Sequence, residues 1–472
     1  MRDQKRMEGT KTQFQDYAYN TKFKNAVSSW ASNSVFAQAD NAKTYLQLLE
    51  EIEKDTNTSE RCPRQTDLVK LEQKLEVEFF KTVKLVFCTC SMSAHPTLMD
   101  HFKADVVIIE EAGQGLVGDI AIPLAVNRET LQVVQLTGDH KQLRPVVVTE
   151  RQNEACNAIR ESIFAQYFDH DLFQVFGYRQ LKEQFRMHPD ISDWPNKTFY
   201  GGKLRNNLVT GNREPELQVT MDAFMKHYFP TWNNSHRICI DVSGENTQSE
   251  QWHSSSSVVN YAEAFFVDRL VDNLLLFEPP AGGRKVQTED LYLISPYAGQ
   301  ITLLKRLGDK DCGTVKASTT NGTQGGEGLI SIVSLVQNQG EDRAGALGYI
   351  WQPHQLNVEC TRGMLYEFIV GNFHTWCSSI RRAEDELMVS RKKRTFVSLC
   401  EDLMESGSIV RSEDMSTVEE NGTVLGSFFT DLPNQKYVAG HNRKRPMLGV
   451  PGGAYQRSAF GTLFQGGKRR KY

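Results

Sequence analysis

The sequence lacks several features that would assign it to a broad class at once. It has no run of 18 apolar residues and no apolar stretch behind its first methionine, so we expect no membrane span and no secretory signal. Its nine cysteines are odd in number and include no C-x-x-C pair, which favours free thiols in a reducing compartment. No histidine pairs with cysteine at zinc-finger spacing. We therefore expect a protein of the nucleus or cytoplasm without a structural metal site.

One further absence concerns phosphate binding. Many nucleotide-binding proteins carry the pattern G-x-x-x-x-G-K-S/T between a strand and a helix, because this loop lets backbone N–H groups surround the phosphates. The only Gly-Lys pairs of this chain lie in Gly202-Lys203-Leu204 and Gly467-Lys468-Arg469, which have neither the serine or threonine nor the upstream glycine. The 472 residues therefore contain no such loop.

The bulk composition is that of an ordinary globular protein, with 39% hydrophobic residues, 24% charged residues and a net charge of −4. The length predicts about three domains. Apolar residues at helical spacing, such as Leu68, Leu71 and Leu75, predict a mostly helical segment over residues 1–82. Residues 83–179 and 180–400 are expected to form two domains. Residues 401–472, first acidic and then basic, are expected to be a tail of low order.

From residue 84 onward, short apolar runs alternate with polar stretches, which indicates an α/β fold. Residues such as Val106–Ile109 are apolar on both faces, as buried strands of a parallel sheet must be. The other strands that we expect are Lys84–Cys88, Leu131–Leu136, Arg237–Val242, Asp290–Ser295, Leu329–Leu335 and Glu367–Gly371.

Two carboxylates, Glu110 and Glu111, follow the apolar strand that ends at Ile109. The carboxyl edge of a parallel sheet is where α/β proteins bind ligands. In an ATPase, the first acid of such a pair helps to hold Mg²⁺, usually through water, and the second orients the attacking water molecule. Acids at the end of a strand are also common in proteins without catalysis. The segment Ala112–Gln114 and the motif that comes next favour the functional interpretation.

Two later segments carry groups that suit phosphate. In Gly138–Leu143, the glycine permits a sharp turn after a strand, and Gln142 offers both a donor and an acceptor to a γ-phosphate and to water. In Gln184–Pro189, Arg186 offers a planar set of donors for phosphate oxygens. His188, directly before a proline, is interpreted as a structural hydrogen-bonding residue.

In this order, the three segments resemble motifs two, three and four of a superfamily 1 helicase, in the branch of the nonsense-mediated-decay helicase and senataxin. Three further stretches resemble later motifs: Ser295–Gln300, Gln324–Glu327 (motif five) and Leu356–Arg362 (motif six). The resemblance covers about residues 84–372. It implies two RecA-like domains of the P-loop NTPase type with parallel sheets, the first of them incomplete at its N-terminal side, and makes residues 1–82 a remnant of an insertion or accessory region.

The resemblance also implies ATP and Mg²⁺ as cofactors and single-stranded RNA or DNA as the partner. It assigns Glu110 to the metal and Arg362 to an arginine finger on the γ-phosphate. The implied catalytic residues are Glu110, Glu111, Gln142, Arg186 and Arg362. The implied nucleotide-binding residues are Gly138, Asp139, Gln184, Gln324, Gly325 and Glu327. The implied nucleic-acid contacts are Ser295, Pro296, Tyr297, Gln300 and Thr361.

The sequence departs from the family pattern at several positions. Glu110 stands where the family has aspartate, and Asn321, Thr323 and Leu329 replace other family residues. Three interpretations therefore stay open: an ATP-dependent helicase cut short so that ATP hydrolysis by this chain alone is doubtful, a pseudo-helicase that binds nucleic acid or protein, and a fragment of a gene model. A missing N-terminal segment or a protein partner would complete the first domain, whose apolar strands would otherwise be exposed. Phosphate and sugar contacts carry no base code, so RNA and DNA are not distinguished.

Overall fold

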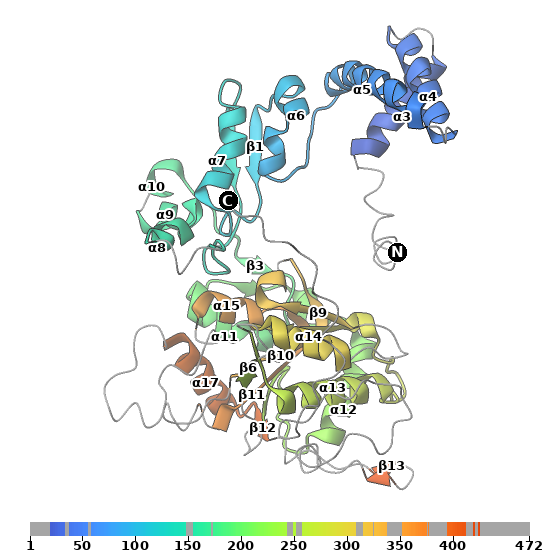
Figure 1. Cartoon of the computed structure of the whole chain (residues 1–472). Coiled ribbons are helices and arrows are strands. Elements are labelled where there is room, and N and C mark those ends of the chain that lie inside the picture. Colours follow the sequence, from blue (N-terminus) through green and yellow to red (C-terminus); the bar gives the residue numbers. More distant parts are fainter. Residues whose placement is uncertain are drawn as a thin grey trace, which may run out of the picture. The chain divides into compact units, whose positions relative to one another are not determined.

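The computed structural model describes residues 19–33, 37–54, 58–147, 154–170, 173–242, 249–251, 257–307, 315–323, 325–337, 352–374, 376, 394–411, 419–420 and 423–424. The chain divides into two compact units (Figure 1). The first contains the residues up to His140 together with Arg144–Tyr178, and the second contains Lys141–Leu143 and the residues from Arg179 onward. We describe each unit by itself.

The first unit begins with three helices, α3 (Tyr19–Ser32), α4 (Ala39–Lys54) and α5 (Thr58–Phe80). They pack through an apolar cluster that includes Phe23, Tyr45 and Phe79. A small α/β portion follows. Its elements are η1 (Ser91–Ala94), α6 (Pro96–His101), β1 (Val106–Ile109), α7 (Val117–Val126), β2 (Val133–Leu136), α8 (Cys156–Arg160), α9 (Ile163–Asp169) and α10 (Phe173–Phe176).

Strands β1 and β2 form a parallel two-stranded sheet whose two faces differ sharply. One face packs through Ile109 against Ile120 of α7. On the other face, Val106, Ile108 and Val133 are 51%, 55% and 52% exposed. This face of the sheet therefore leaves apolar side chains largely exposed among the described residues.

The prediction of a strand at Lys84–Cys88 is wrong. Residues 83–89 belong to no strand, and Leu85 and Phe87 are 68% and 86% exposed. An apolar run becomes a strand only where another strand offers its free N–H and C=O groups. No described segment of the first unit pairs with this run.

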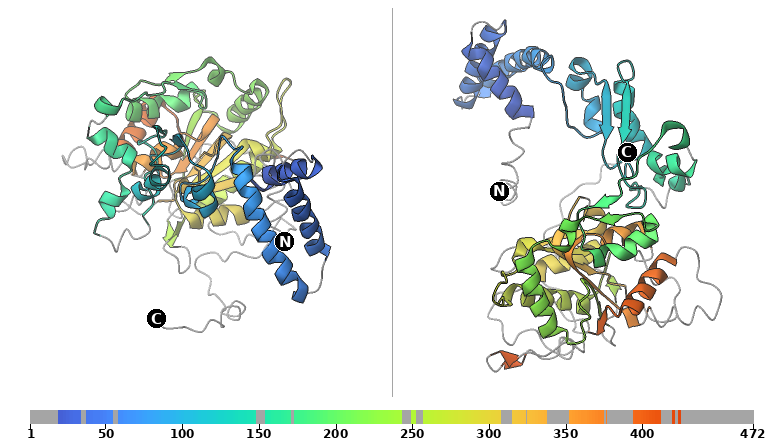
Figure 2. Two further views of the ribbon diagram at one scale, coloured as in Figure 1. Left: turned by 90° about the horizontal axis from the view of Figure 1, so that it is seen from above. Right: turned by 180° about the vertical axis from the view of Figure 1, so that it is seen from behind.

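The second unit is built on a six-stranded sheet in which every neighbouring pair is parallel. Its order is β12 (Ile409–Arg411), β5 (Arg237–Asp241), β11 (Gly363–Gly371), β10 (Gly328–Ser334), β8 (Leu291–Ser295) and β9 (Lys316–Thr319). Figures 1 and 2 show helices on both sides of this sheet. The predicted α/β class with parallel sheets is therefore confirmed.

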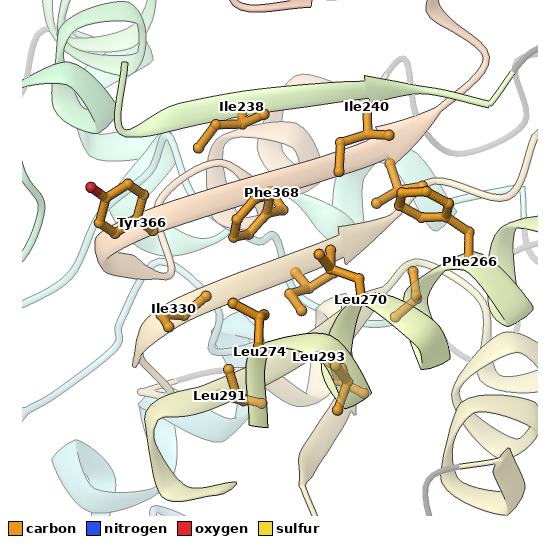
Figure 3. Packing of buried hydrophobic residues seen from close by; sticks show 14 of the residues in the cluster. Ile238, Ile240, Phe266, Leu270, Leu274, Leu291, Leu293, Ile330, Tyr366 and Phe368 are labelled. Atoms are coloured by element: carbon orange, nitrogen blue, oxygen red, sulfur yellow. The ribbon is translucent and has the colours of Figure 1, made fainter. Parts of the chain in front are cut away.

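Two apolar cores hold the helices of the second unit onto the sheet. Helices α12 (Pro215–Tyr228), α13 (Tyr261–Leu276) and α14 (Ala298–Leu307) pack on one face. Figure 3 shows Leu270 and Leu274 of α13 in this core with Ile330 and Phe368 of the strands. Helices α11 (Pro189–Tyr200), α15 (Pro353–Glu359) and α17 (Arg394–Ser406) pack on the other face. Apolar residues on both faces of each central strand, as the sequence predicts, are what this three-layer arrangement requires.

The sheet also contains two strands that the sequence did not indicate. Lys316–Thr319 is polar, as an edge strand can be, and Ile409–Arg411 has only three residues. Because α17 ends at Ser406 and β12 pairs with β5, the second unit continues past residue 400 to at least residue 411. The short remaining elements are β3 (Glu183–Gln184), β4 (Arg205–Asn206), η2 (Leu208–Gly211), β6 (Glu250–Gln251), β7 (Val258–Val259), η3 (Thr288–Asp290), η4 (Thr320–Thr323), β13 (Glu419–Glu420) and β14 (Thr423–Val424).

A search of the described helices for a stretch both long enough and apolar enough to cross a bilayer found none.

The exposed sheet face predicts unequal resistance of the two units to protease. Full burial of a valine or isoleucine side chain contributes about 1.5–3 kcal/mol, and the first unit forgoes much of this at three positions. In limited trypsin digestion followed by mass spectrometry, we expect cuts between residues 84 and 147 before any within residues 180–400 of the second unit, with cuts in the tail 401–472 left out of the comparison. Ile108→Thr should leave the cleavage rate there unchanged, whereas Ile109→Thr, on the packed face, should raise it. Equal effects of the two substitutions, or equal resistance of the two units, would contradict this account of the sheet.

Candidate functional site

The segments that resemble motifs four, five and six meet in the second unit at the amino-terminal edge of its sheet. Glu327 directly precedes β10, Arg362 directly precedes β11, and Arg186 lies in the loop between β3 and α11. Nε of Arg186 donates to Oε2 of Glu327 at 2.8 Å, and its Nη1 donates to the carbonyl of Thr361 at 3.4 Å. The backbone N–H of His188 donates to the carbonyl of Met364 in β11 at 2.8 Å. Three segments far apart in sequence therefore form one charged cluster.

Arg362 is buried, and its guanidinium donates from Nε and from both terminal nitrogens, with Nη2 3.1 Å from the hydroxyl of Thr361. Nε donates to the carbonyl of Val358 in α15 at 3.0 Å, which fixes the plane of the group. Nη1 reaches the carbonyl of Gly326, and Nη2 reaches Oε1 of Gln142, both at 3.4 Å, which is long for a hydrogen bond. Phosphate oxygens could replace these two long contacts while the bonds to Val358 and Thr361 persist. The predicted catalytic residues Gln142, Arg186 and Arg362 are thus brought together.

The backbone of Lys141 and Gln142 is held by helix α15. Nδ2 of Asn357 donates to the carbonyl of Lys141 at 3.0 Å and to the hydroxyl of Tyr200 at 2.9 Å. Nδ1 of His354 lies 2.8 Å from the carbonyl of Gln142. Sequence reasoning did not select these three residues. Asn357 stands inside the segment that resembles motif six, whereas nothing in the sequence marks His354 or Tyr200.

Gln184 and the glycines of motif five shape the loops around the arginines. The amide of Gln184 accepts from the N–H groups of Arg186 and Met187 and donates to the carbonyl of Met187 and to Asn206, so its four hydrogen-bonding positions all serve the loop. In this structure the amide of Gln184 supports the loop through these bonds, and contact of Gln184 with a nucleotide stays a prediction. Gly325 has φ +68°, which favours glycine. Gln324 lies outside the described residues.

The predicted metal and water residues lie in the first unit, where β1 and β2 end. Glu110 and Glu111 are both exposed, and Glu111 has φ +55°, unusual for a residue other than glycine. A Cβ atom on Gly138 would lie 2.9 Å from the backbone nitrogen of Gly113, so these two turns touch because both have glycine there. Asp139 follows in the second turn. Exposed carboxylates fit Mg²⁺, which prefers oxygen ligands and keeps several of its waters. Glu110 is the residue that would hold it.

The segment Ser295–Gln300 lies at the opposite, carboxyl-terminal edge of the second unit's sheet. Seven-residue strand β10 separates the two edges, a length of roughly 23 Å at 3.3 Å per residue. The side chains of Ser295, Tyr297 and Gln300 are buried, whereas Pro296 is half-buried. Thr361, also buried, lies at the amino-terminal edge, where its hydroxyl donates to the carbonyl of Asn357 at 2.6 Å. Contact of these five residues with nucleic acid stays a prediction.

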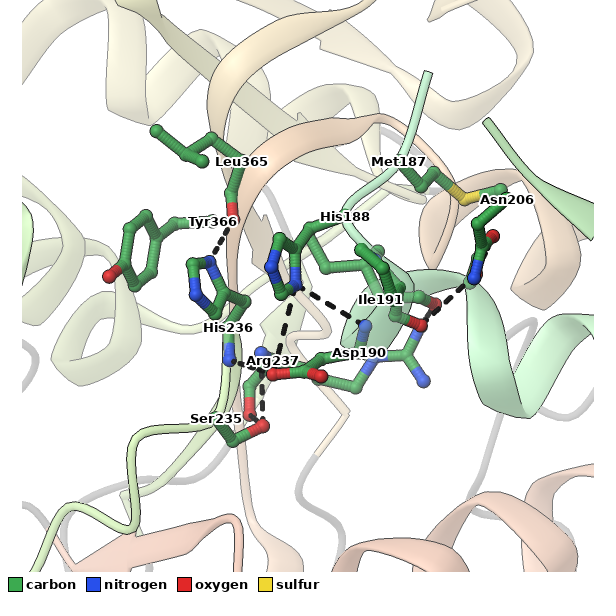
Figure 4. Close-up of polar contacts among 12 residues, drawn as sticks. Met187, His188, Asp190, Ile191, Asn206, Ser235, His236, Arg237, Leu365 and Tyr366 are labelled. Carbon is green, nitrogen blue, oxygen red and sulfur yellow. Dashed lines mark hydrogen bonds and ion pairs between the residues drawn. The ribbon is translucent and has the colours of Figure 1, made fainter. Parts of the chain in front are cut away.

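One group of side chains, His188, Asp190 and His236, has the composition of a metal site (Figure 4). The two imidazole rings are stacked, with centroids 3.5 Å apart and an angle of 15° between them. An ion bound at about 2.1 Å must lie in the plane of each imidazole ligand. It cannot lie in two nearly parallel planes that far apart, so the arrangement does not fit a shared ion.

The interpretation of His188 as a structural residue is supported by its contacts. Its Nδ1 accepts from the N–H of Asp190 at 3.3 Å and caps helix α11, and burial followed by the neighbouring His236 lowers the pKa of His188 to about 4. Nδ1 of His236 lies 2.8 Å from the carbonyl of Leu365. A neutral ring at position 188 therefore links motif four to strand β11.

Motif six is also joined to the turn η4, which directly precedes motif five, by a buried carboxyl group, that of Glu359. The hydroxyl of Thr320 in η4 donates to its Oε1 at 2.6 Å, and Oε2 has no hydrogen-bond partner among the described residues. Burial raises the pKa of Glu359 to about 7 from a usual value of 4.5. The folded chain therefore holds this proton more tightly than the unfolded chain does.

This pKa predicts a pH-dependent loss of stability. Because the pKa is higher in the folded state, the contribution of Glu359 is fully present below pH 4.5 and is lost as the pH rises to about 7. Glu359→Gln cannot ionise, so between pH 4.5 and 8 it should lose less unfolding free energy than wild type, by on the order of 3 kcal/mol. Urea unfolding followed by tryptophan fluorescence measures this difference. Thr320→Val, which removes the donor to the carboxylate, should steepen the loss, and a wild-type slope in Glu359→Gln would refute the assignment.

Comparison with known proteins agrees with the geometry. Two family models, each described as an AAA domain, match residues 3–150 and 159–374. The chain is 28% identical over 320 residues to "Regulator of nonsense transcripts 1 homolog" of Neurospora crassa, covering 65% of this chain and 26% of that protein. It is 26% identical to "DNA polymerase alpha-associated DNA helicase A" of Saccharomyces cerevisiae, with coverage of 69% and 48%. It is 30% identical to "5'-3' DNA helicase ZGRF1" of Mus musculus, with coverage of 62% and 14%.

The chain thus spans less than half the length of each of these relatives. Among solved structures, "The structure of PRRSV helicase" covers 65% of this chain and 47% of that chain at 12% identity, with a TM-score of 0.29, which is too low to support a conclusion. The two family matches, the relatives and the order of the motifs agree with one another. The chain belongs to the superfamily 1 helicases of the nonsense-mediated-decay type, and its 472 residues contain no glycine-rich phosphate loop.

Proposed function

We propose that this chain supplies the γ-phosphate-sensing and strand-binding part of an ATP-dependent helicase acting on single-stranded RNA or DNA in the nucleus or cytoplasm. Arg186 and Arg362 would contact the γ-phosphate, Gln142 and Glu111 would orient the attacking water, and Glu110 would hold Mg²⁺. When bound, ATP would supply the phosphoryl group and Mg²⁺ would neutralise its charge.

The observation that carries this proposal is the cluster at the amino-terminal edge of the second unit's sheet. Two guanidinium groups and Gln142 are gathered there from three separate segments. Arg186 is bound to Glu327, a carboxylate that is about half exposed, and Arg362 is held by Val358 and Thr361 while its contacts with Gly326 and Gln142 are long. Guanidinium donors held in place in this way suit a ligand rich in anionic oxygens.

The same chain, tested alone, should turn over no ATP. The absent loop would contribute three or four charge-assisted contacts at roughly 1.5 kcal/mol each, or about 5 kcal/mol in all. At about 1.4 kcal/mol per decade, that loss lowers nucleotide affinity on the order of a thousandfold. We propose that a segment with the phosphate loop, from a longer form of the protein or from a partner, covers the exposed face of Val106, Ile108 and Val133 and restores hydrolysis.

A second candidate is a pseudo-helicase, a scaffold that binds nucleic acid or protein without hydrolysis. The departures at Glu110 and Thr323 favour it. In this case no added segment would produce turnover.

These candidates predict distinct results in one assay. The purified 472-residue chain should release no phosphate from radiolabelled ATP above background, with or without an unstructured 20-nucleotide strand. It should still bind that strand, more weakly as salt rises, because phosphate contacts release counterions. Turnover after addition of a protein that carries the phosphate loop supports the helicase, and its absence supports the scaffold.

The control for this assay is a matched pair of arginine substitutions. Arg362→Ala removes the predicted finger, whereas Arg128→Ala removes an exposed arginine of the first unit. Strand-stimulated release by the chain alone, abolished by the first substitution and kept by the second, would overturn the expectation that this chain is inactive by itself.

A further inference from the structure

The carboxyl-terminal edge of the second unit contains a strained turn. Val336, two residues past the end of β10, has φ +70°, a conformation that a β-branched residue adopts only against steric resistance. The N–H of Gln337 donates to the carbonyl of Leu335 at 2.8 Å, so the chain reverses over three residues. Val336 is fully buried. Such strain persists only where the surroundings fix the backbone from several sides.

The group that fixes this backbone is the carboxylate of Glu263, in the first turn of α13. The N–H of Val336 lies 2.9 Å from its Oε1 and 3.0 Å from its Oε2, and the hydroxyl of Ser334 donates to Oε1 at 2.8 Å. Nδ2 of Asn260 donates to the carbonyl of Val336 at 3.3 Å. The turn is therefore bound through both its N–H and its C=O to the amino end of one helix.

The same turn is tied to the segment Ser295–Gln300. Nε2 of Gln300 donates to the hydroxyl of Ser334 at 3.0 Å. Nε2 of Gln337 donates to the hydroxyl of Tyr297 at 2.6 Å. The ends of β8 and β10 are thus joined by side chains on both sides of Val336, and Glu263 lies at the centre of the network.

A buried carboxylate is costly unless it is compensated. Here the hydrogen-bonding groups around Glu263 are neutral, and burial raises the pKa of Glu263 to about 7 in spite of them. An apolar residue would fill the same position without that cost, but it would leave the N–H of Val336 unpaired. The carboxylate is therefore explained by the shape of the turn.

We propose that Glu263 is the positioning residue for strand binding at this edge of the sheet: by holding Val336 at a positive φ, it fixes the buried turns 295–300 and 334–337, beside which a single-stranded nucleic-acid backbone binds. This inference rests on the proposed function, which supplies the strand. Glu263 itself is buried and does not touch the strand.

The test is the binding of a fluorescein-labelled 20-nucleotide single strand to the full chain, measured by anisotropy. Glu263→Ala should weaken binding at least about tenfold, or one decade. Glu263→Gln keeps one acceptor oxygen, so its affinity for the strand should lie between those of wild type and Glu263→Ala. Glu216→Gln, at an exposed glutamate in the first turn of α12, corrects for the loss of one negative charge.

The decisive variant is the double substitution Glu263→Ala with Val336→Gly. Glycine adopts φ +70° without strain, so it should need no carboxylate to hold the turn. The affinity of the double variant for the strand should return to within about threefold of the affinity of Val336→Gly alone, a difference of under half a decade. A merely structural role for Glu263 predicts no such rescue, because the glycine also deletes a buried side chain. Hydrogen exchange should show lost protection of the amide of residue 336 in Glu263→Ala.

The outcomes separate the two proposals. Wild type that binds no strand overturns both. Wild type that binds, with a folded Glu263→Ala that binds equally well, overturns only the role of Glu263. If Val336→Gly alone still binds the strand but the double variant does not regain affinity, the proposed role of Glu263 is overturned as well.

Discussion

The buried ion pair between Arg237 and Glu367 fixes the parts of the second unit on which its site depends. Nε of Arg237 in β5 donates to Oε2 of Glu367 in β11 at 2.9 Å, and both side chains are buried. Nη2 of Arg237 also donates to the carbonyls of Ile191 in α11 and Cys360 at the end of α15. Removal of one partner of such a pair costs roughly 3–5 kcal/mol, because the other charge stays buried without compensation. One guanidinium therefore holds two strands and two helices.

The consequence for the site is geometric. Arg186 lies just before α11, and Arg362 follows Cys360 directly, so both predicted phosphate-binding arginines are attached to elements that Arg237 holds. Their positions relative to each other are thus set inside the core of the second unit. A ligand that displaces the long contacts of Arg362 with Gly326 and Gln142 leaves the supporting pair intact.

The sequence was sufficient for the features that depend on local pattern. The central strands β5, β8, β10 and β11 are apolar on both faces, and the motifs between them predicted which loops carry charge. The sequence was insufficient where strand formation depends on pairing with a segment far away in the chain. Lys84–Cys88 is as apolar as a true strand, but nothing described pairs with it, and Lys316–Thr319 is a strand because β8 offers its edge.

The same limit applies to the site. Arg186, Arg362 and Gln142 could be chosen from motif order, because each chemistry needs that residue type. The burial of Ser295, Tyr297 and Gln300 could not be predicted from the motif, because a motif gives residue types and not which side chains face the solvent. Glu263 and Arg237 carry no local signal at all. Their roles exist only because residues such as Val336 and Glu367, 73 and 130 positions away in sequence, are brought to them by the sheet.

The two units show how one kind of sequence gives opposite results. Strand β1 is wholly apolar and β10 contains two serines, yet β10 has strands on both sides and helices on both faces, whereas β1 has one described neighbour and one covered face. Burial stabilises a strand only in proportion to the apolar surface that other elements remove from water. The second unit can therefore preserve its arginine cluster by its own packing. The carboxylates Glu110 and Glu111 depend on a sheet that has half of its apolar surface in solvent, and whatever covers that face also decides how firmly they are held.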